Sequence, residues 1–203
     1  LNGGQGTDTL TMTATLAANA SAIGFSTTSV EKMSVNIIDN DAAAAHTMTM
    51  NMLNANIPAI TLLGSTKTAV ADGLTLTNVA EGTVVEMAGT ANMDLTLTYA
   101  AAFLAGTGDA ATLKVNGVTA TSADDSDVTI TAGIETLTIN SSSTASKLGD
   151  VVWGGAALTV TGDAALTIQD ALAATANTID ASAFTGGLTV TTANVTDATD
   201  VDG

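Results

Sequence analysis

The stretch GGQGTDTLT, residues 3–11, decides the fold that the sequence predicts. It fits the pattern G-G-x-G-x-D-x-U-x at every constrained position, where U is a large apolar residue, and repeats of this pattern build parallel β-helices. Gly3, Gly4 and Gly6 can reach positive φ and turn their carbonyl oxygens inward, while Leu10 fills the coil behind the loop. We therefore predict an all-β fold, a parallel β-solenoid of short, irregular coils.

The same loop is a candidate calcium site. Asp8 offers a hard anionic oxygen, and calcium prefers loose cages of oxygen ligands. We expect the ligands of this loop to come from Gly3, Gln5, Gly6 and Asp8. The alternative interpretation is a glycine-rich turn that Asp8 caps.

Composition favours strands over helices. The chain is rich in Thr and Ala, aromatic residues make up only 2%, and there is one proline. Thr suits strands, whereas the Leu, Glu, Lys and Arg that long helices prefer are scarce. Alternation of apolar residues with Thr predicts strands with one buried face. The predicted strands cover residues 10–16, 33–37, 46–53, 74–79, 84–87, 93–99, 111–115, 128–131, 136–139, 158–161, 166–169, 177–179 and 188–192.

An antiparallel sandwich and a parallel solenoid both fit such strands. Two-residue hairpin signals between long alternating strands are rare, which weakens the sandwich. Small residues recur from strand to strand with few bulky aromatics, as narrow coils require. We expect coils of about 20 to 30 residues, each rising about 4.8 Å.

An internal echo supports repetition. Residues 30–36 and 134–140 share the pattern [V/I]-E-x-[M/L]-x-[V/I]-N, and residues 85–87 repeat its first half. We expect these segments to be equivalent strands in different coils. Glu31 and Glu135 each begin a strand, so we assign them a structural role, either facing outward or accepting a hydrogen bond from a turn amide.

The charge of the chain narrows its partners. The 203 residues include 20 acidic and 4 basic ones, which gives a net charge of −16. Such a chain repels nucleic acid and anionic membrane surfaces, and bound divalent cations would relieve its self-repulsion. There is no cysteine, no apolar run of about 18 residues and no signal segment. Because the chain begins with Leu1, we expect it to be a piece of a longer protein.

These features together resemble a known family. The loop at residues 3–11, a Thr/Ala-rich stretch, a Val-Glu-x-Met strand and the later segment Ile179-Asp180-Ala181-Ser182-Ala183-Phe184 are similar to RTX surface-layer (S-layer) proteins of the Caulobacter kind. In that family one loop makes half a calcium site and the stacked neighbouring loop makes the other half. The resemblance implies that calcium folds the coils and links subunits into a two-dimensional lattice.

The resemblance also suggests how the chain is divided. Residues 1–11 would end an RTX calcium-binding block, and residues 12–203 would form a solenoid segment that leads into a further block after residue 203. Asp200 and Asp202 would then be additional calcium ligands. Asp124, Asp125 and Asp127 are better interpreted as a solvated acidic turn, and residues 38–41 (Ile-Asp-Asn-Asp) are a weaker case of the same kind.

The sequence predicts a structural role rather than catalysis. The chain has one His, His46, no Arg, and no spacing that suggests a nucleophile with a base. We expect a calcium-dependent, self-assembling segment of a bacterial cell-surface protein, located outside the cell. Its partners would be copies of itself and, as a further option, cell-surface polysaccharide, without nucleic acid or membrane insertion. The alternative is a stalk or ligand-binding section of a large secreted RTX adhesin.

Overall fold

The structure, a computed structural model, describes residues 1–69, 72–173, 175–176, 178–192 and 200–202. None of these residues lies in a helix, and the chain forms one strand after another. The strands are β1 (Thr9–Leu16), β2 (Ala20–Gly24), β3 (Lys32–Asp39), β4 (Thr47–Asn51), β5 (Ala59–Leu63), β6 (Gly73–Val79), β7 (Val84–Ala88), β8 (Asp94–Tyr99), β9 (Ala110–Asn116), β10 (Val128–Ile130), β11 (Thr136–Ser141), β12 (Ser146–Leu148), β13 (Val151–Val152), β14 (Ala157–Gly162), β15 (Leu166–Leu172), β16 (Thr178–Asp180), β17 (Leu188–Thr192) and β18 (Asp200–Asp202).

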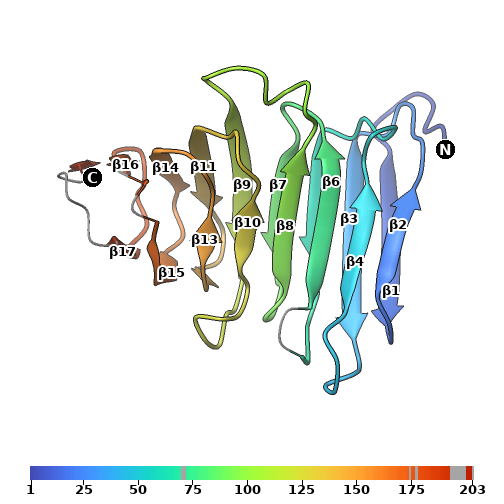
Figure 1. The fold of residues 1–203 in the computed structure, drawn as a ribbon, viewed down its shortest axis with the longest axis horizontal. Coiled ribbons are helices and arrows are strands. Elements are labelled where there is room, and N and C mark those ends of the chain that lie inside the picture. Colours follow the sequence, from blue (N-terminus) through green and yellow to red (C-terminus); the bar gives the residue numbers. More distant parts are fainter. Residues whose placement is uncertain (70–71, 174, 177, 193–199, 203) are drawn as a thin grey trace.

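Across the described residues the strands form three parallel sheets. The largest has the order β1-β3-β5-β7-β9-β11-β14-β16-β18, the second β13-β10-β8-β6-β4-β2, and the third β12-β15-β17. Figure 1 shows the strands stacked side by side along the long axis, with β1 and β2 at one end and β16 and β17 at the other. The chain winds through about 8 turns. The predicted parallel β-solenoid is confirmed, and the antiparallel sandwich is excluded.

Alternation along most of the strands builds the core between the sheets. In β8, Leu95, Leu97 and Tyr99 are buried, while Asp94 and the two threonines between them are half-buried. Since successive side chains of a strand point to opposite faces, one face of each strand meets the opposite sheet. The core also contains Met48 and Met50 of β4, and Met52, which directly follows β4. Trp153 lies in the core as well and is 3% exposed.

Coil length varies while the strands keep their register. In the largest sheet Thr136 pairs with Ala157, and Val84 pairs with Thr112. The coil that begins at Val84 therefore contains more residues than the coil that begins at Thr136. Both separations lie within the coil length that the sequence predicts. The prediction is wrong for the coil between β8 and β10, which is longer, because Leu95 pairs with Val128. The extra residues are taken up by the connections at the coil edges, which are the places where polar side chains gather.

The internal echo is confirmed at the level of strands, because β3, β7 and β11 all lie in the largest sheet. Residue by residue the copies do not superimpose. Ser34 is in register with Thr61 and then with Glu86. Glu86 is in register with Lys114 and then with Asn140, so neither Glu86 nor Glu135 lies at the level of Glu31.

Among the described residues, no helix has the length and apolar character needed to span a bilayer.

Candidate cation-binding sites

The glycine loop, residues 3–11, leads into β1 at one end of the solenoid. Gly4 and Gly6 have φ angles of 94° and 116°, as the glycine pattern predicts. The prediction of a positive φ is wrong for Gly3, which needs its small size for another reason. A Cβ atom on Gly3 would lie 1.8 Å from the carbonyl oxygen of Ser29 in the next coil. Gly3 is therefore required for close stacking of two coils, and the Gly3 N–H donates to the Thr28 carbonyl at 3.0 Å.

Asp8 is tied to the next coil through its backbone. Its N–H donates to Glu31 Oε2 at 2.8 Å. Its carbonyl oxygen accepts the N–H groups of Glu31 at 3.2 Å and Lys32 at 3.1 Å. These bonds hold Asp8 in place without using its carboxylate.

The carboxylate of Asp8 has unused bonding capacity. Its Oδ2 atom is buried and has no hydrogen-bond partner within the described part of the chain. A cavity of about 330 Å³ lies beside it, lined by Leu1, Asn2, Gly3, Asp8, Thr9, Leu10 and Val30. A buried carboxylate oxygen without a donor is unfavourable, so a cation suits this place. Asp8 and the carbonyl groups of the glycine loop are groups that could hold calcium there.

The six predicted ligands fall into two groups. Gly3, Gln5, Gly6 and Asp8 lie in the loop at the β1 end, where Gln5 and Gly6 are exposed and Gly3 and Asp8 are half-buried. Asp200 and Asp202 belong to β18, which pairs with β16 at the opposite end of the largest sheet. Their side chains lie outside what the structure describes. The structure thus places the two predicted groups at the two ends of the solenoid.

The link between Asp8 and Glu31 recurs four coils later. The Asp109 N–H donates to Glu135 Oε2 at 2.8 Å. The Asp109 carbonyl oxygen accepts the N–H groups of Glu135 and Thr136. Asp109 Oδ2 is also buried and without a hydrogen-bond partner in the described structure. The expected structural role of Glu31 and Glu135 is confirmed in its second form, acceptance of a hydrogen bond from a backbone amide.

A column of aspartates runs along another coil edge, and the sequence reasoning identified only part of it. Asp94, Asp127 and Asp150 each adjoin register-matched residues of β8, β10 and β13. Asp94 Oδ1 accepts the Asp127 N–H at 3.0 Å, and Asp127 Oδ1 accepts the Asp150 N–H at 2.8 Å. We call these three residues the aspartate column. Its only sequence signal is an aspartate at the start of successive strands.

One lysine neutralises one end of this column. Lys67 Nζ lies 2.8 Å from Asp94 Oδ1 and 3.6 Å from Asp125 Oδ1, and its side chain is 2% exposed. Burial raises the pKa of Asp94, although Lys67 opposes the shift. Burial also raises the pKa of Asp150, and the Asp127 and Asp170 carboxylates add to it. Carboxylates in this column therefore repel one another, and bound cations would favour their charged form.

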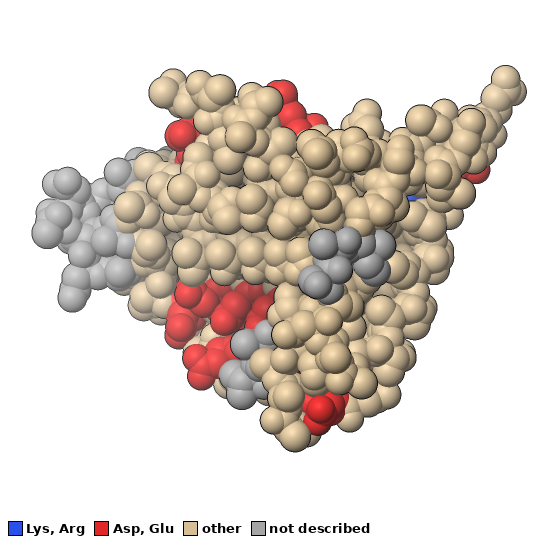
Figure 2. Space-filling model, turned by 45° about the vertical axis from the view of Figure 1, so that its right-hand side comes forward, with Lys and Arg blue, Asp and Glu red and all other residues tan. Residues whose placement is uncertain are grey.

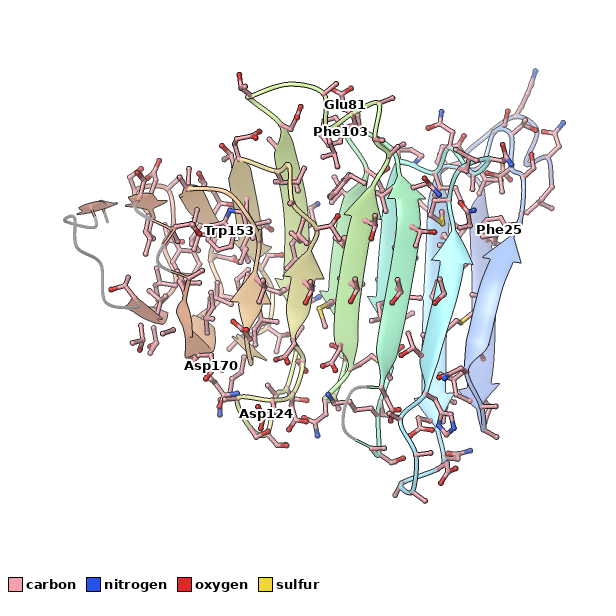
Figure 3. All side chains as sticks on the ribbon, in the orientation of Figure 1. Phe25, Glu81, Phe103, Asp124, Trp153 and Asp170 are labelled. Atoms are coloured by element: carbon pink, nitrogen blue, oxygen red, sulfur yellow. The ribbon has the colours of Figure 1, made fainter. Side chains whose placement is uncertain are left out.

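In the acidic turn before β10, the Asp125 carboxylate accepts hydrogen bonds from nearby residues of the same turn. Asp125 Oδ2 accepts hydrogen bonds from Thr121 Oγ1 at 2.6 Å and from the Ser122 N–H at 3.1 Å. Burial raises the pKa of Asp125, but these bonds and Lys67 outweigh that effect and leave the pKa below its usual value. Asp124 is exposed and, like Asp170, lies at the lower edge of the molecule in Figure 3.

The aspartate column borders a shallow groove on the face of the second sheet. The groove has a volume of about 220 Å³ and is lined by Thr47, Gly73, Leu74, Thr75, Asp94, Thr96, Asp127 and Thr129. Figure 2 shows acidic side chains gathered in one hollow of the face it displays. Carboxylates and threonine hydroxyls give this groove an oxygen-rich wall.

A third acidic group is buried rather than exposed at an edge. Asp39, His46 and Asp72 bring one possible ligand atom each to within 4.8 Å of one another. Sequence reasoning noted residues 38–41 as a weak acidic case and His46 as an isolated histidine. It missed Asp72 and could not join the three.

Comparison with known proteins assigns no family. The chain matches no protein-family model, no curated protein and no solved structure. The fold and the sites define a class only: an acidic parallel β-solenoid with carboxylates stacked along its coil edges.

Proposed function

We propose that this chain is a structural segment of a secreted bacterial surface protein, a β-solenoid that binds calcium and assembles with copies of itself as an S-layer. The observation that carries the proposal is the buried Oδ2 atom of Asp8, which has no partner among the described residues and lies beside a cavity at the β1 end. Gly3 packs against the carboxyl group of Asp8, since a Cβ atom on Gly3 would lie 2.9 Å from Asp8 Cγ. A calcium ion there would be shared with a loop stacked on the same end, in the manner that the resemblance to RTX repeats implies.

The β1 end also suits stacking. β1 is the terminal strand of the largest sheet, so its outer edge carries backbone groups without a neighbouring strand among the described residues. A cavity of about 380 Å³ at this end is lined by Leu1, Leu10, Thr11, Met12, Phe25, Ser26, Met33 and Met50. Figure 3 shows Phe25 at the same end of the molecule. A further coil stacked here would cover apolar side chains while it completes the calcium site.

The charge of the chain gives calcium a second role. Copies of a chain with a net charge of −16 repel one another. Calcium bound at Asp8 and along the aspartate column would lower that repulsion and allow side-by-side packing. The resemblance to RTX S-layer proteins is what supports a location at the cell surface and assembly into a lattice.

A section of a secreted adhesin is the second candidate. The oxygen-rich groove beside the aspartate column favours it, because threonine hydroxyls and calcium-bound carboxylates can hold sugar hydroxyl groups. Imaging of the native cell surface separates the candidates. A regular lattice supports the S-layer, whereas isolated fibres without a lattice support the adhesin.

The calcium proposal is tested by stability and assembly. We expect millimolar calcium to raise the melting temperature and promote assembly, and a chelator to reverse both effects. Asp8→Asn should reduce the calcium-dependent rise. Asp163→Asn is the matched control, because it removes an exposed carboxylate that, within the described structure, accepts only a Ser143 N–H. If calcium changes neither stability nor assembly of the unmodified chain, the proposal is wrong; an equal calcium effect in Asp8→Asn would reject Asp8 as a ligand.

A further inference from the structure

Asp39, His46 and Asp72 meet at one buried coil corner. Asp39 ends β3, His46 precedes β4, and Asp72 precedes β6 in the next coil. Because Thr47 is in register with Gly73, His46 and Asp72 lie at equivalent positions of adjacent coils. The solenoid thus stacks the histidine directly on one aspartate and turns the chain so that the other lies beside it.

All three side chains are removed from water. The residues are 1%, 5% and 0% exposed in the order Asp39, His46, Asp72. His46 Nδ1 lies 3.3 Å from Asp39 Oδ1. A charge-assisted hydrogen bond is usually shorter, about 2.7–2.9 Å. The imidazole and the carboxylate therefore face each other at a distance that leaves their attraction incompletely satisfied.

The protein orients both carboxylates with other donors. Asp39 Oδ2 accepts the Thr68 hydroxyl at 2.5 Å and the Thr68 N–H at 3.3 Å. Asp72 Oδ2 accepts the Ala69 N–H at 3.0 Å, and Asp72 Oδ1 accepts the His46 N–H. Such outer contacts fix the direction of ligand side chains in metal sites. Asp39 Oδ1 accepts the Asp41 N–H at 3.1 Å and also faces the imidazole.

The corner lacks a balancing charge among the described residues. Two buried carboxylates face one histidine, so even a protonated His46 would leave an excess negative charge. Lys67 is close in sequence, but its ammonium group is engaged with Asp94 and Asp125. A cation bound between the two carboxylates would supply the missing positive charge.

We propose that Asp39, His46 and Asp72 bind one divalent transition-metal ion, of the kind that zinc represents. An imidazole nitrogen suits zinc and its neighbours, whereas calcium and magnesium prefer oxygen ligands alone. In a tetrahedral site with bonds of about 2.0–2.1 Å, neighbouring ligand atoms lie roughly 3.3–3.4 Å apart. The separation of His46 Nδ1 and Asp39 Oδ1 is 3.3 Å. The three ligand atoms, now within 4.8 Å of one another, would draw together around the ion.

Such an ion would join two coils of the solenoid. It would neutralise both carboxylates and link the β3–β4 corner to the beginning of β6. Three protein ligands leave one position for water, so the site combines a structural role with an open coordination position. It is independent of the calcium site proposed at Asp8, which lies at the opposite end of β3 and uses oxygen ligands.

The test uses metal-stripped protein titrated with Zn²⁺ or Co²⁺. We expect one Co²⁺ per chain with the visible absorption of a four-coordinate nitrogen and oxygen site, and a higher melting temperature with Zn²⁺. His46→Asn should weaken Co²⁺ binding at least about tenfold, since it removes the nitrogen ligand while an amide can still bond to Asp39. Asp180→Asn is the control, because that exposed carboxylate bonds only to Ser182 among the described residues. It should leave binding unchanged.

Three results would overturn the proposal. One is the absence of Co²⁺ absorption in the unmodified protein, which would leave His46 as an ordinary ion-pair partner of Asp39 and needs no variant to fold. Another is equal Co²⁺ affinity of His46→Asn and the unmodified protein. The last is displacement of Co²⁺ by an equal concentration of Ca²⁺, which would indicate a hard oxygen site. None of these results bears on the effect of calcium at Asp8.

Discussion

Glu31 and Glu135 show how one acidic side chain can serve the backbone of a neighbouring coil. Each carboxylate accepts the N–H of an aspartate in the preceding coil, and each glutamate N–H returns a bond to the carbonyl oxygen of that aspartate. The sequence pattern predicted both positions, because the same residue types recurred at the start of two strands. It did not identify Asp8 and Asp109 as a matched pair, because the segment Gly106-Thr107-Gly108-Asp109 lacks the full glycine pattern of residues 3–11.

Replacement of Glu135 tests this exchange. Glu135→Ala leaves the Asp109 N–H without its acceptor, and we expect a loss of about 1–2 kcal/mol in the free energy of unfolding. Glu135→Gln keeps an acceptor oxygen and should cost less. Glu86→Ala is the control, because in the described structure Glu86 accepts only the Thr61 hydroxyl, at 3.3 Å. Urea unfolding of the three variants gives the comparison. Equal losses for Glu135→Ala and Glu86→Ala would contradict the assigned role.

The raised pKa of Asp150 predicts a pH effect of definite sign. A carboxyl group whose folded pKa exceeds its unfolded value stabilises the fold below the unfolded pKa, and this contribution is lost as pH rises through the folded pKa. Burial and the Asp127 and Asp170 carboxylates raise the pKa of Asp150. Asp150→Asn should therefore raise the melting temperature at pH 7 in calcium-free buffer, by up to about 2 °C after allowance for solvent screening.

The gain from Asp150→Asn should vanish near pH 3, where both proteins carry a neutral group at this position. Melting curves at the two pH values measure the difference. A gain of the same size at both values would show that charge is not its cause.

Most strands of the largest sheet could be predicted from the alternation of apolar and polar residues. The strands that were missed lack a clear alternation. The alternating runs predicted β1, β3, β7, β9, β11 and β14, although residue 177 of the predicted run 177–179 lies outside the described residues. β5 reads Ala-Ile-Thr-Leu-Leu after Pro58 and was missed, as were β2 and the short strands β12 and β13. β12 and β13 are too short to show a clear period, and the alternating residues around them do not extend beyond the strand, so contact with a neighbouring coil defines them.

Gly155 shows that coils stack closely even where no unusual backbone angle demands glycine. A Cβ atom there would lie 2.3 Å from the Glu135 carbonyl oxygen and 2.4 Å from that of Ile134. We expect Gly155→Ala to destabilise the protein by about 1–3 kcal/mol, because rigid backbone of the preceding coil cannot yield. Gly187→Ala is the control, since a Cβ there meets nothing within 4 Å. Thermal unfolding distinguishes them, and equal stability of the two variants would contradict tight stacking at residue 155.

The candidate sites depend on coil stacking more than on local sequence, and this limits their prediction. The glycine loop could be found because its constrained residues follow one another closely along the chain. Asp39, His46 and Asp72 span two coils, and coil length differs from one coil to the next, so no fixed spacing relates them. The aspartate column has the same origin. Only the register of parallel strands brings such residues together.

At the scale of the whole molecule, the net charge of −16 allows generic screening to be separated from specific calcium binding. Sodium chloride should raise the melting temperature of metal-free protein, because a Debye length of about 10 Å at 0.1 M and 3 Å at 1 M weakens repulsion between carboxylates of neighbouring coils. Calcium at matched ionic strength should raise it further, since an ion held by several oxygens binds the folded chain alone. Magnesium should have a smaller effect, as it releases its water ligands reluctantly. If sodium, magnesium and calcium salts at equal ionic strength give the same melting temperature, screening explains all the stabilisation and the calcium site at Asp8 does not exist.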